Sequence, residues 1–283
     1  MGDLNVYDPA NNESQTLSFE ARGDVTVPPG MRCALVVSDE ACFDLSPLAA
    51  LRLDDLHFLH LWHEEVVDEH LEHIKRLRFL EELLLLGQFT DVGLQYLGNL
   101  TGLRRLTLVI EGSHTTDAGL VFLKNLSELD SLYLLSEGTF SNAGLAYVVT
   151  LKKLRHLSLR GTLIDGVGLS YLCQLPLLTR LWVSHAEIFD SDLAQNIHRL
   201  ANLTGLGLDA THITDDGLTY LQGLKNLQHL DLSSCEITDS GLVHLQNLTA
   251  VDLLDLSHTN IAQTAINRLQ EALPNCRILT RDR

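Results

Sequence analysis

The sequence predicts an α/β solenoid in which a parallel sheet of about eleven strands forms the concave face and short helices form the convex face. Two observations lead to this fold class. Similar segments recur along the chain, each with a Gly-Leu pair, whose glycines are Gly93, Gly119, Gly144, Gly168, Gly217 and Gly241. Within each segment, a helical spacing of leucines is followed by the alternation of a strand. Because one such unit cannot bury its leucines alone, stacked units must share a core.

The spacing of these glycines is regular. Successive glycines stand 24 to 26 residues apart, except Gly168 and Gly217, which are two steps apart with Asp192 in the intervening glycine position. After each pair, leucines recur at every third residue, which predicts one buried side of a short helix. The Thr-Asp that precedes most pairs can accept free N–H groups of the helix start, and the glycine suits a crowded turn.

The strands are predicted from alternating leucines, since alternation places every second side chain on one face of a sheet. Superposing the units gives eleven strand centres, which are Leu35, Leu59, Leu83, Leu106, Leu132, Leu157, Leu181, Leu206, Leu230, Leu254 and Ile278. Strands lie about 4.8 Å apart, whereas packed helices need about 10 Å. The stack is therefore expected to curve into a horseshoe with the sheet inside.

The motif defines three regions of the chain. Residues 1–33 lack it and are predicted to form a β-rich N-terminal cap that covers the exposed end of the core. Residues 34–264 hold the repeats, and residues 265–283 are predicted to form a C-terminal capping repeat.

Charge restricts the classes of partner. The formal net charge of the 283-residue chain is −17. Such a chain repels phosphate backbones, and it has no basic amphipathic segment for an anionic membrane surface. We therefore expect neither nucleic acid nor a membrane as partner. The sequence carries no indication of oligomeric state.

The N-terminal segment and the cysteine spacing lead to expectations about the cellular compartment and about cofactors. The N-terminal segment has acidic residues where a secretory signal has basic and apolar ones, and no apolar run approaches 20 residues, which predicts a cytoplasmic protein. The cysteines are Cys33, Cys42, Cys173, Cys235 and Cys276. They are odd in number and lack the close pairs of zinc or redox motifs, so reduced thiols and no cofactor are expected.

The stretches "LRHLSLRGTLIDGVGLSYL" and "LQHLDLSSCEITDSGLVHL" resemble leucine-rich repeats of the ribonuclease-inhibitor-like class. Their short form is most similar to bacterial members and to the repeat region of F-box leucine-rich proteins. The resemblance is most specific between residues 77 and 261. It implies a horseshoe fold and a role in binding other proteins, although the chain has no F-box.

Residues 56–74 contain five of the 13 histidines, which are His57, His60, His63, His70 and His73. The repeat register separates them, because His60 belongs to a strand whereas His70 and His73 belong to a helix. The strand and helix layers lie about 10 Å apart, while zinc needs nitrogen ligands within about 2.1 Å. A metal-dependent enzyme at this cluster is therefore the least favoured of our hypotheses.

Other catalytic patterns are missing. Serine, histidine and aspartate are frequent along the strands, but their positions recur with the repeat, as polar residues of a solvated strand face do. The glycines follow the repeat and are not clustered as in a phosphate-binding loop. We predict no catalytic residues and a protein that is not an enzyme.

Side chains that alternate with the buried leucines should line the concave face. Large apolar and aromatic side chains gathered on such a face indicate a binding surface, with arginines as frequent contributors. The predicted partner-binding residues are Phe58, His60, Trp62, Leu84, Leu86, Val109, Tyr133, Leu135, Arg160, Arg180 and Trp182. The alternative is that the N-terminal cap or neighbouring side chains cover Phe58 and Trp62.

These observations favour a non-enzymatic recognition protein that binds a protein or peptide on its concave face. A second hypothesis, which rests on the family resemblance alone, is an adaptor or effector that presents targets to a separate enzyme such as a ubiquitin ligase.

Overall fold

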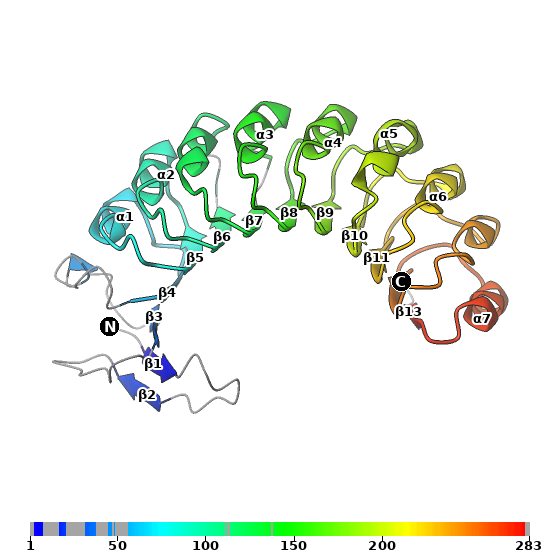
Figure 1. Cartoon of the computed structure of the whole chain (residues 1–283), viewed down its shortest axis with the longest axis horizontal. Coiled ribbons are helices and arrows are strands. Elements are labelled where there is room, and N and C mark those ends of the chain that lie inside the picture. Colours follow the sequence, from blue (N-terminus) through cyan, green and yellow to red (C-terminus); the bar gives the residue numbers. More distant parts are fainter. Residues whose placement is uncertain are drawn as a thin grey trace. The chain divides into compact units, whose positions relative to one another are not determined.

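The computed structural model describes residues 3–7, 17–20, 32–37, 45–46, 48, 56–110, 112, 114–136 and 138–280. It forms two compact units, Met1–Thr139 and Phe140–Arg283, called the first and the second unit below. Each unit is a stack of strand and helix repeats (Figure 1).

The strands of the first unit are β1 (Asp3–Tyr7), β2 (Leu17–Glu20), β3 (Arg32–Val37), β4 (Phe58–Trp62), β5 (Glu82–Gly87), β6 (Arg105–Ile110) and β7 (Ser131–Leu135). Its helices are α1 (Asp68–Ile74), α2 (Asp91–Leu97) and the 3-10 helix η2 (Gly119–Asn125). Strands β3 to β7 pair in parallel in chain order, whereas β1 pairs antiparallel with both β2 and β3.

The strands of the second unit are β8 (His156–Arg160), β9 (Arg180–Ser184), β10 (Gly205–Gly207), β11 (His229–Asp231), β12 (Leu253–Asp255) and β13 (Arg277–Leu279). Its helices are α3 (Asn142–Val148), α4 (Gly166–Leu172), α5 (Asp190–Asn196), η3 (Ile197–Leu200), α6 (Asp215–Leu221), η4 (Gly241–His244) and α7 (Gln263–Ala272). Strands β8 to β13 pair in parallel in chain order.

The predicted fold class is confirmed. Each of the eleven predicted strand centres lies in its own strand, from Leu35 in β3 to Ile278 in β13. In each unit the helices cover one face of the sheet, and we call the opposite face the open face (Figure 1). The predicted region boundaries at residues 33 and 264 stay predictions, with β1 and β2 before the first boundary and β13 after the second.

The core lies between the sheet and the helices. In β5, for example, Leu83 and Leu85 point toward the helix layer and are fully buried, as are Leu94 and Leu97 of α2. The leucines spaced by two along the strands therefore face the leucines spaced by three along the helices. Truncating one such leucine to alanine costs about 2–5 kcal/mol in typical cores.

The Thr-Asp pair links neighbouring repeats. Thr90 caps α2, because its hydroxyl oxygen accepts a hydrogen bond from the N–H of Val92 at 3.1 Å. Asp68 of the preceding repeat accepts from both the backbone N–H and the hydroxyl of Thr90, at 2.8 and 2.6 Å. The same arrangement joins Asp91 to Thr116, Asp190 to Thr214 and Asp215 to Thr238. The sequence predicted the cap, whereas the bond between repeats is a finding of the structure.

The glycine of most Gly-Leu pairs leaves room for this aspartate, and at Gly168 the neighbouring side chain is Asn142. A Cβ atom added at Gly93 would lie 2.5 Å from Oδ1 of Asp68 and 2.9 Å from Cδ1 of Leu71. Gly217 and Gly241 are crowded in the same way by Asp190 and Asp215. The glycine is thus required by the side chain of the neighbouring repeat.

One pair of repeats exchanges the two residues. Asp192 of α5 occupies the glycine position, and Gly166 of α4 occupies the position of the preceding aspartate. A Cβ atom at Gly166 would overlap the carboxylate of Asp192. Asp192 accepts the backbone N–H of Phe189 at 2.9 Å, the donor that an aspartate of the preceding repeat binds at other helix starts. Carboxylate and glycine have changed places, so the hydrogen bond is now made within one repeat, while Asp192 still packs against Gly166 of the preceding repeat.

This exchange predicts a double-mutant result. Gly166→Asp alone should lower the free energy of unfolding by about 1–3 kcal/mol through overpacking, and Asp192→Gly alone should cost about 1 kcal/mol through loss of the cap. The double variant should recover most of this loss, since the carboxylate introduced at position 166 could then accept the N–H of Phe189. Urea denaturation of the four proteins measures the coupling. If the losses of the two single variants simply add in the double variant, the two positions are not coupled and this explanation of the exchange is wrong.

Candidate functional site

The strand register of the first unit brings most of the predicted site residues together on its open face. The first row across β4 to β7 is Phe58, Glu82, Arg105 and Ser131, the second is His60, Leu84, Thr107 and Tyr133, and the third is Trp62, Leu86, Val109 and Leu135. These neighbours agree with the strand register obtained by superposing the repeats.

An apolar surface occupies the second and third rows. Trp62 is 48% exposed and Tyr133 is 37% exposed. Partly buried apolar side chains lie between them on neighbouring strands. We call this set the apolar patch, and its members are Trp62, Leu84, Leu86, Val109, Tyr133 and Leu135. Its two aromatic side chains keep much of their area available for a partner.

Phe58 does not belong to this surface. The expectation that it is exposed is wrong, because its exposed fraction is only 7%. The guanidinium carbon of Arg32 lies 6.0 Å from the centre of its ring, and that of Arg105 lies 5.8 Å from it. Covering by neighbouring side chains, the alternative considered for this residue, therefore applies to Phe58 and not to Trp62.

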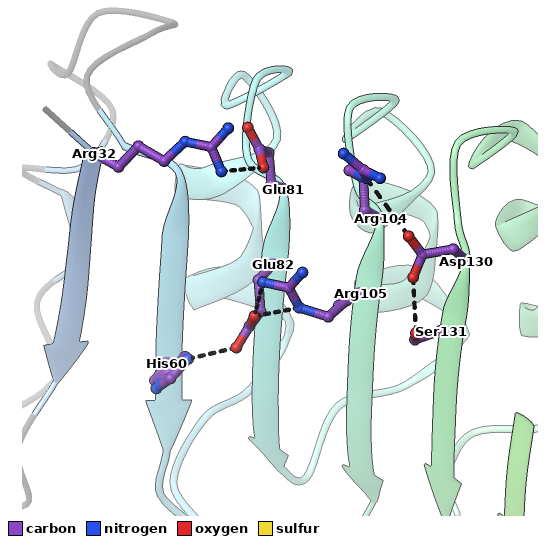
Figure 2. A network of polar contacts seen from close by, with 8 residues as sticks. All are labelled: Arg32, His60, Glu81, Glu82, Arg104, Arg105, Asp130 and Ser131. Atoms are coloured by element: carbon purple, nitrogen blue, oxygen red, sulfur yellow. Dashed lines mark hydrogen bonds and ion pairs between the residues drawn. The ribbon is translucent and has the colours of Figure 1, made fainter. Parts of the chain in front are cut away.

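A polar network borders the apolar patch (Figure 2). Glu82 accepts hydrogen bonds from Nε2 of His60 at 3.1 Å and from Nε of Arg105 at 2.6 Å. These bonds, that from His60 first, hold the pKa of the Glu82 carboxyl below its usual range. Arg32 donates to Glu81 at 2.8 Å in the same region. The predicted site residue His60 therefore contributes to a charge-compensated rim.

The other histidines of this region have local structural contacts. Nδ1 of His70 accepts the N–H of Val67 at 3.1 Å at the start of α1. Nδ1 of His63 accepts the N–H of Glu65 at 3.1 Å in the turn after β4. Strand and helix separate the histidines as the register predicted. Within the described residues, no three His, Cys, Asp or Glu side chains converge as a metal site would require.

In the second unit, the three remaining predicted residues lie on the open face of β8 and β9. Arg180 is opposite His156, Trp182 is opposite Ser158, and Arg160 is opposite Ser184. Arg160 is exposed, whereas Arg180 and Trp182 are half-buried. We call Arg160, Arg180 and Trp182 the arginine–tryptophan site.

Two glycines of β10 receive the indole of Trp182. Gly205 pairs with Arg180 and Gly207 with Trp182. A Cβ atom at Gly205 would lie 2.7 Å from Cη2 of the indole, and one at Gly207 would overlap Cδ1. The ring thus lies across the backbone of β10. The sequence contains a signal for this contact, because two glycines of one strand are in register with Arg180 and Trp182 of the preceding strand.

Beyond β10 the open face becomes acidic. Ser184 donates to Asp209 at 2.6 Å, and Asp231 and Asp255 face each other on β11 and β12. Burial raises the pKa of the Asp231 carboxyl, and the charges of Asp209 and Asp255 act in the same direction. Burial also raises the pKa of the thiols of Cys173, Cys235 and Cys276, which form no disulfides. Cys42 lies outside the described residues.

The raised pKa of Asp231 predicts a pH-dependent stability. The folded state binds a proton at this carboxyl more readily than the unfolded chain does, so its contribution to stability falls as pH rises from about 3.9. Asp231→Asn should remove this loss and should raise the free energy of unfolding at pH 7 by about 0.5 kcal/mol. Urea denaturation should show the gain shrinking as the pH is lowered toward 4. Glu236→Gln, at an exposed position, serves as the control, and an equal gain there would contradict the explanation.

No helix in the described part of the chain is both long enough and apolar enough to cross a membrane. A family model described as "Leucine rich repeat" matches residues 201–261. No curated protein matches the sequence.

Solved structures with a similar fold include an internalin from Listeria monocytogenes, with a TM-score of 0.59 and 21% identity over 88% of this chain and 82% of that protein. A leucine-rich-repeat protein of Leptospira interrogans has a TM-score of 0.50 and 21% identity, over 81% of this chain and 59% of that protein. A TDR receptor has a TM-score of 0.50 and 16% identity, over 81% of this chain and 39% of the receptor. The finer likeness to the ribonuclease-inhibitor-like class and to F-box proteins stays a prediction. Residues 201–261 match the leucine-rich-repeat family, and the repeats and the fold of the described residues are those of a leucine-rich-repeat solenoid.

Proposed function

We propose that this chain is a recognition module that binds a protein or peptide partner on its open face. The observation that carries the proposal is the apolar patch of the first unit, where Trp62 and Tyr133 remain exposed although neighbouring side chains cover Phe58. Exposed aromatic side chains within one apolar surface are typical of interfaces. The receptor among the similar folds is in keeping with a binding role, although at 16% identity the likeness extends only to the fold.

Burial of the two aromatic side chains by a partner would contribute enough free energy for specific binding. If a partner buries about 100 Å² on each of the two aromatic side chains, the gross contribution is about 2.5 kcal/mol for each. Part of this is offset by the loss of freedom on association. The bordering network of His60, Glu82 and Arg105 is already paired, so a partner that covers it need not supply a countercharge.

The proposal includes a binding role without catalysis and a cytoplasmic location. The binding role without catalysis rests on the open face of the first unit, where the polar side chains of His60, Glu82 and Arg105 are bound to one another.

The proposed function predicts the effect of removing the exposed aromatic side chains. Affinity capture from the native cells identifies partners, and binding of the purified partner to the full chain is then measured by calorimetry. Trp62→Ala and Tyr133→Ala should each weaken binding at least tenfold, which corresponds to about 1.4 kcal/mol. The melting temperature should stay within about 2 °C, because both side chains project from the sheet away from the core.

Phe79→Ala is the matched control, since Phe79 is exposed at 58% and lies in the turn after α1, outside the open face. Its partner affinity should equal that of the unchanged chain. If Trp62→Ala and Tyr133→Ala bind as well as Phe79→Ala does, the apolar patch is not the binding surface.

A further inference from the structure

The arginine–tryptophan site of the second unit contains hydrogen-bond donors without acceptors. Among the described residues, no carboxylate or carbonyl oxygen pairs with the guanidinium group of Arg160 or Arg180, and none accepts the indole N–H of Trp182. The three side chains lie on adjacent strands of one open face. By contrast, Arg32, Arg104 and Arg105 of the first unit are paired with Glu81, Asp130 and Glu82 (Figure 2).

The local charge agrees with these donors. On the open face of β8 and β9, Arg160 and Arg180 stand with His156, Ser158, Trp182 and Ser184 and without a carboxylate, in a chain whose net charge is −17. Small residues adjoin Trp182 on three sides, since Ser158 lies beside it on β8, Ser184 follows it on β9, and Gly205 and Gly207 lie on β10. The flat indole, held on β10, is thus flanked by cations and by short side chains over which a peptide could pass.

We propose that this site binds an extended acidic peptide segment of the partner, with carboxylates on Arg160 and Arg180 and an apolar side chain on Trp182. The inference rests on the proposed function, because it names the chemistry of a partner segment that binds the open face of the second unit. Arginine pairs with carboxylates through two parallel hydrogen bonds, and the exposed ring face accepts apolar groups.

The register sets the spacing within such a peptide. Arg160 is level with Ser184, which is four residues beyond Arg180 on β9, and Trp182 is midway. At about 3.3 Å per residue, four residues correspond to about 13 Å along the strands. In an extended peptide, residues i, i+2 and i+4 point to one face and cover the same length. The peptide therefore has the pattern acidic, any, apolar, any, acidic.

Carboxylates fit the surroundings better than phosphates. Asp209 lies next to Ser184 on the same face, with Asp231 and Asp255 on the following strands. These charges oppose a dianion more strongly than a single carboxylate. A nucleic acid would need a continuous basic surface, which the acidic strands β11 and β12 interrupt.

The test uses the full chain and a synthetic nine-residue peptide, Gly-Ser-Glu-Gly-Leu-Gly-Glu-Gly-Ser, with blocked ends. A matched peptide carries glutamine in place of both glutamates, and a third carries phosphoserine there. Binding is measured by isothermal titration calorimetry at low and at physiological salt. The glutamate peptide should bind at least tenfold more tightly than the glutamine peptide, and its affinity should fall as salt rises.

Arg160→Gln and Arg180→Gln should each reduce binding of the glutamate peptide at least fivefold, and the double variant should bind both peptides equally. Arg268→Gln, which alters an exposed arginine of α7, is the matched control and should bind as the unchanged chain does. An Arg160→Glu, Arg180→Glu double variant should instead prefer a lysine version of the peptide.

Equal binding of the glutamate and glutamine peptides, or no effect of the arginine variants, would overturn the inference. Tighter, arginine-dependent binding of the phosphoserine peptide would overturn the carboxylate assignment in favour of phosphate. Neither result contradicts the proposed function. The proposed function is wrong only if Trp62→Ala and Tyr133→Ala bind the native partner as tightly as the unchanged chain does.

Discussion

A carboxylate that binds the helix cap of the next repeat is the contact on which the rest of the structure depends. Asp91 and Thr116 are one example, and Asp190 and Thr214 are another. The aspartate satisfies a backbone N–H near the helix start, where donors lack partners within the helix, and it ties two repeats together beside the helix layer. Because the glycine of the next repeat provides the space for this aspartate, the repeat pattern records a contact between neighbouring repeats. The exchange of Gly166 and Asp192 indicates that the chain retains the pair and not the individual residues.

This arrangement separates the stacking of repeats from recognition. Leucines fill the space between sheet and helices, and the Thr-Asp contacts lie at the helix starts, so neither requires particular side chains on the open face. Side chains there contact chiefly their neighbours on adjacent strands, and they can change without altering the core. The two units use this freedom differently. The first presents the apolar patch with Trp62 and Tyr133, and the second presents a tryptophan between unpaired arginines.

The repeat register predicted strands β3 to β13 and the neighbours on the open face, because a period of two fixes which side chains share a face. Exposure could not be predicted in the same way. Phe58 is buried because Arg105 reaches toward its ring from two strands away while bound to Glu82. The spacing of residues in the sequence does not determine the conformation of such a long side chain. The position of Trp182 over Gly205 and Gly207 and the exchange at Gly166 also depend on contacts between repeats. The sequence contains a signal for each of these two features, but it is found only by comparing pairs of residues at the same position of neighbouring repeats.

Paired and unpaired arginines have opposite consequences for a partner. Arg105 and Glu82 compensate each other at 2.6 Å, so covering them adds no isolated charge to the interface. Covering Arg160 or Arg180 without an acceptor would leave a guanidinium group desolvated and unpaired, which is strongly unfavourable. A partner that places only apolar groups on Trp182 is therefore rejected, while one that also brings carboxylates is accepted. Selectivity in the second unit then comes less from the attraction of the indole than from the cost of leaving its two neighbouring cations without countercharges.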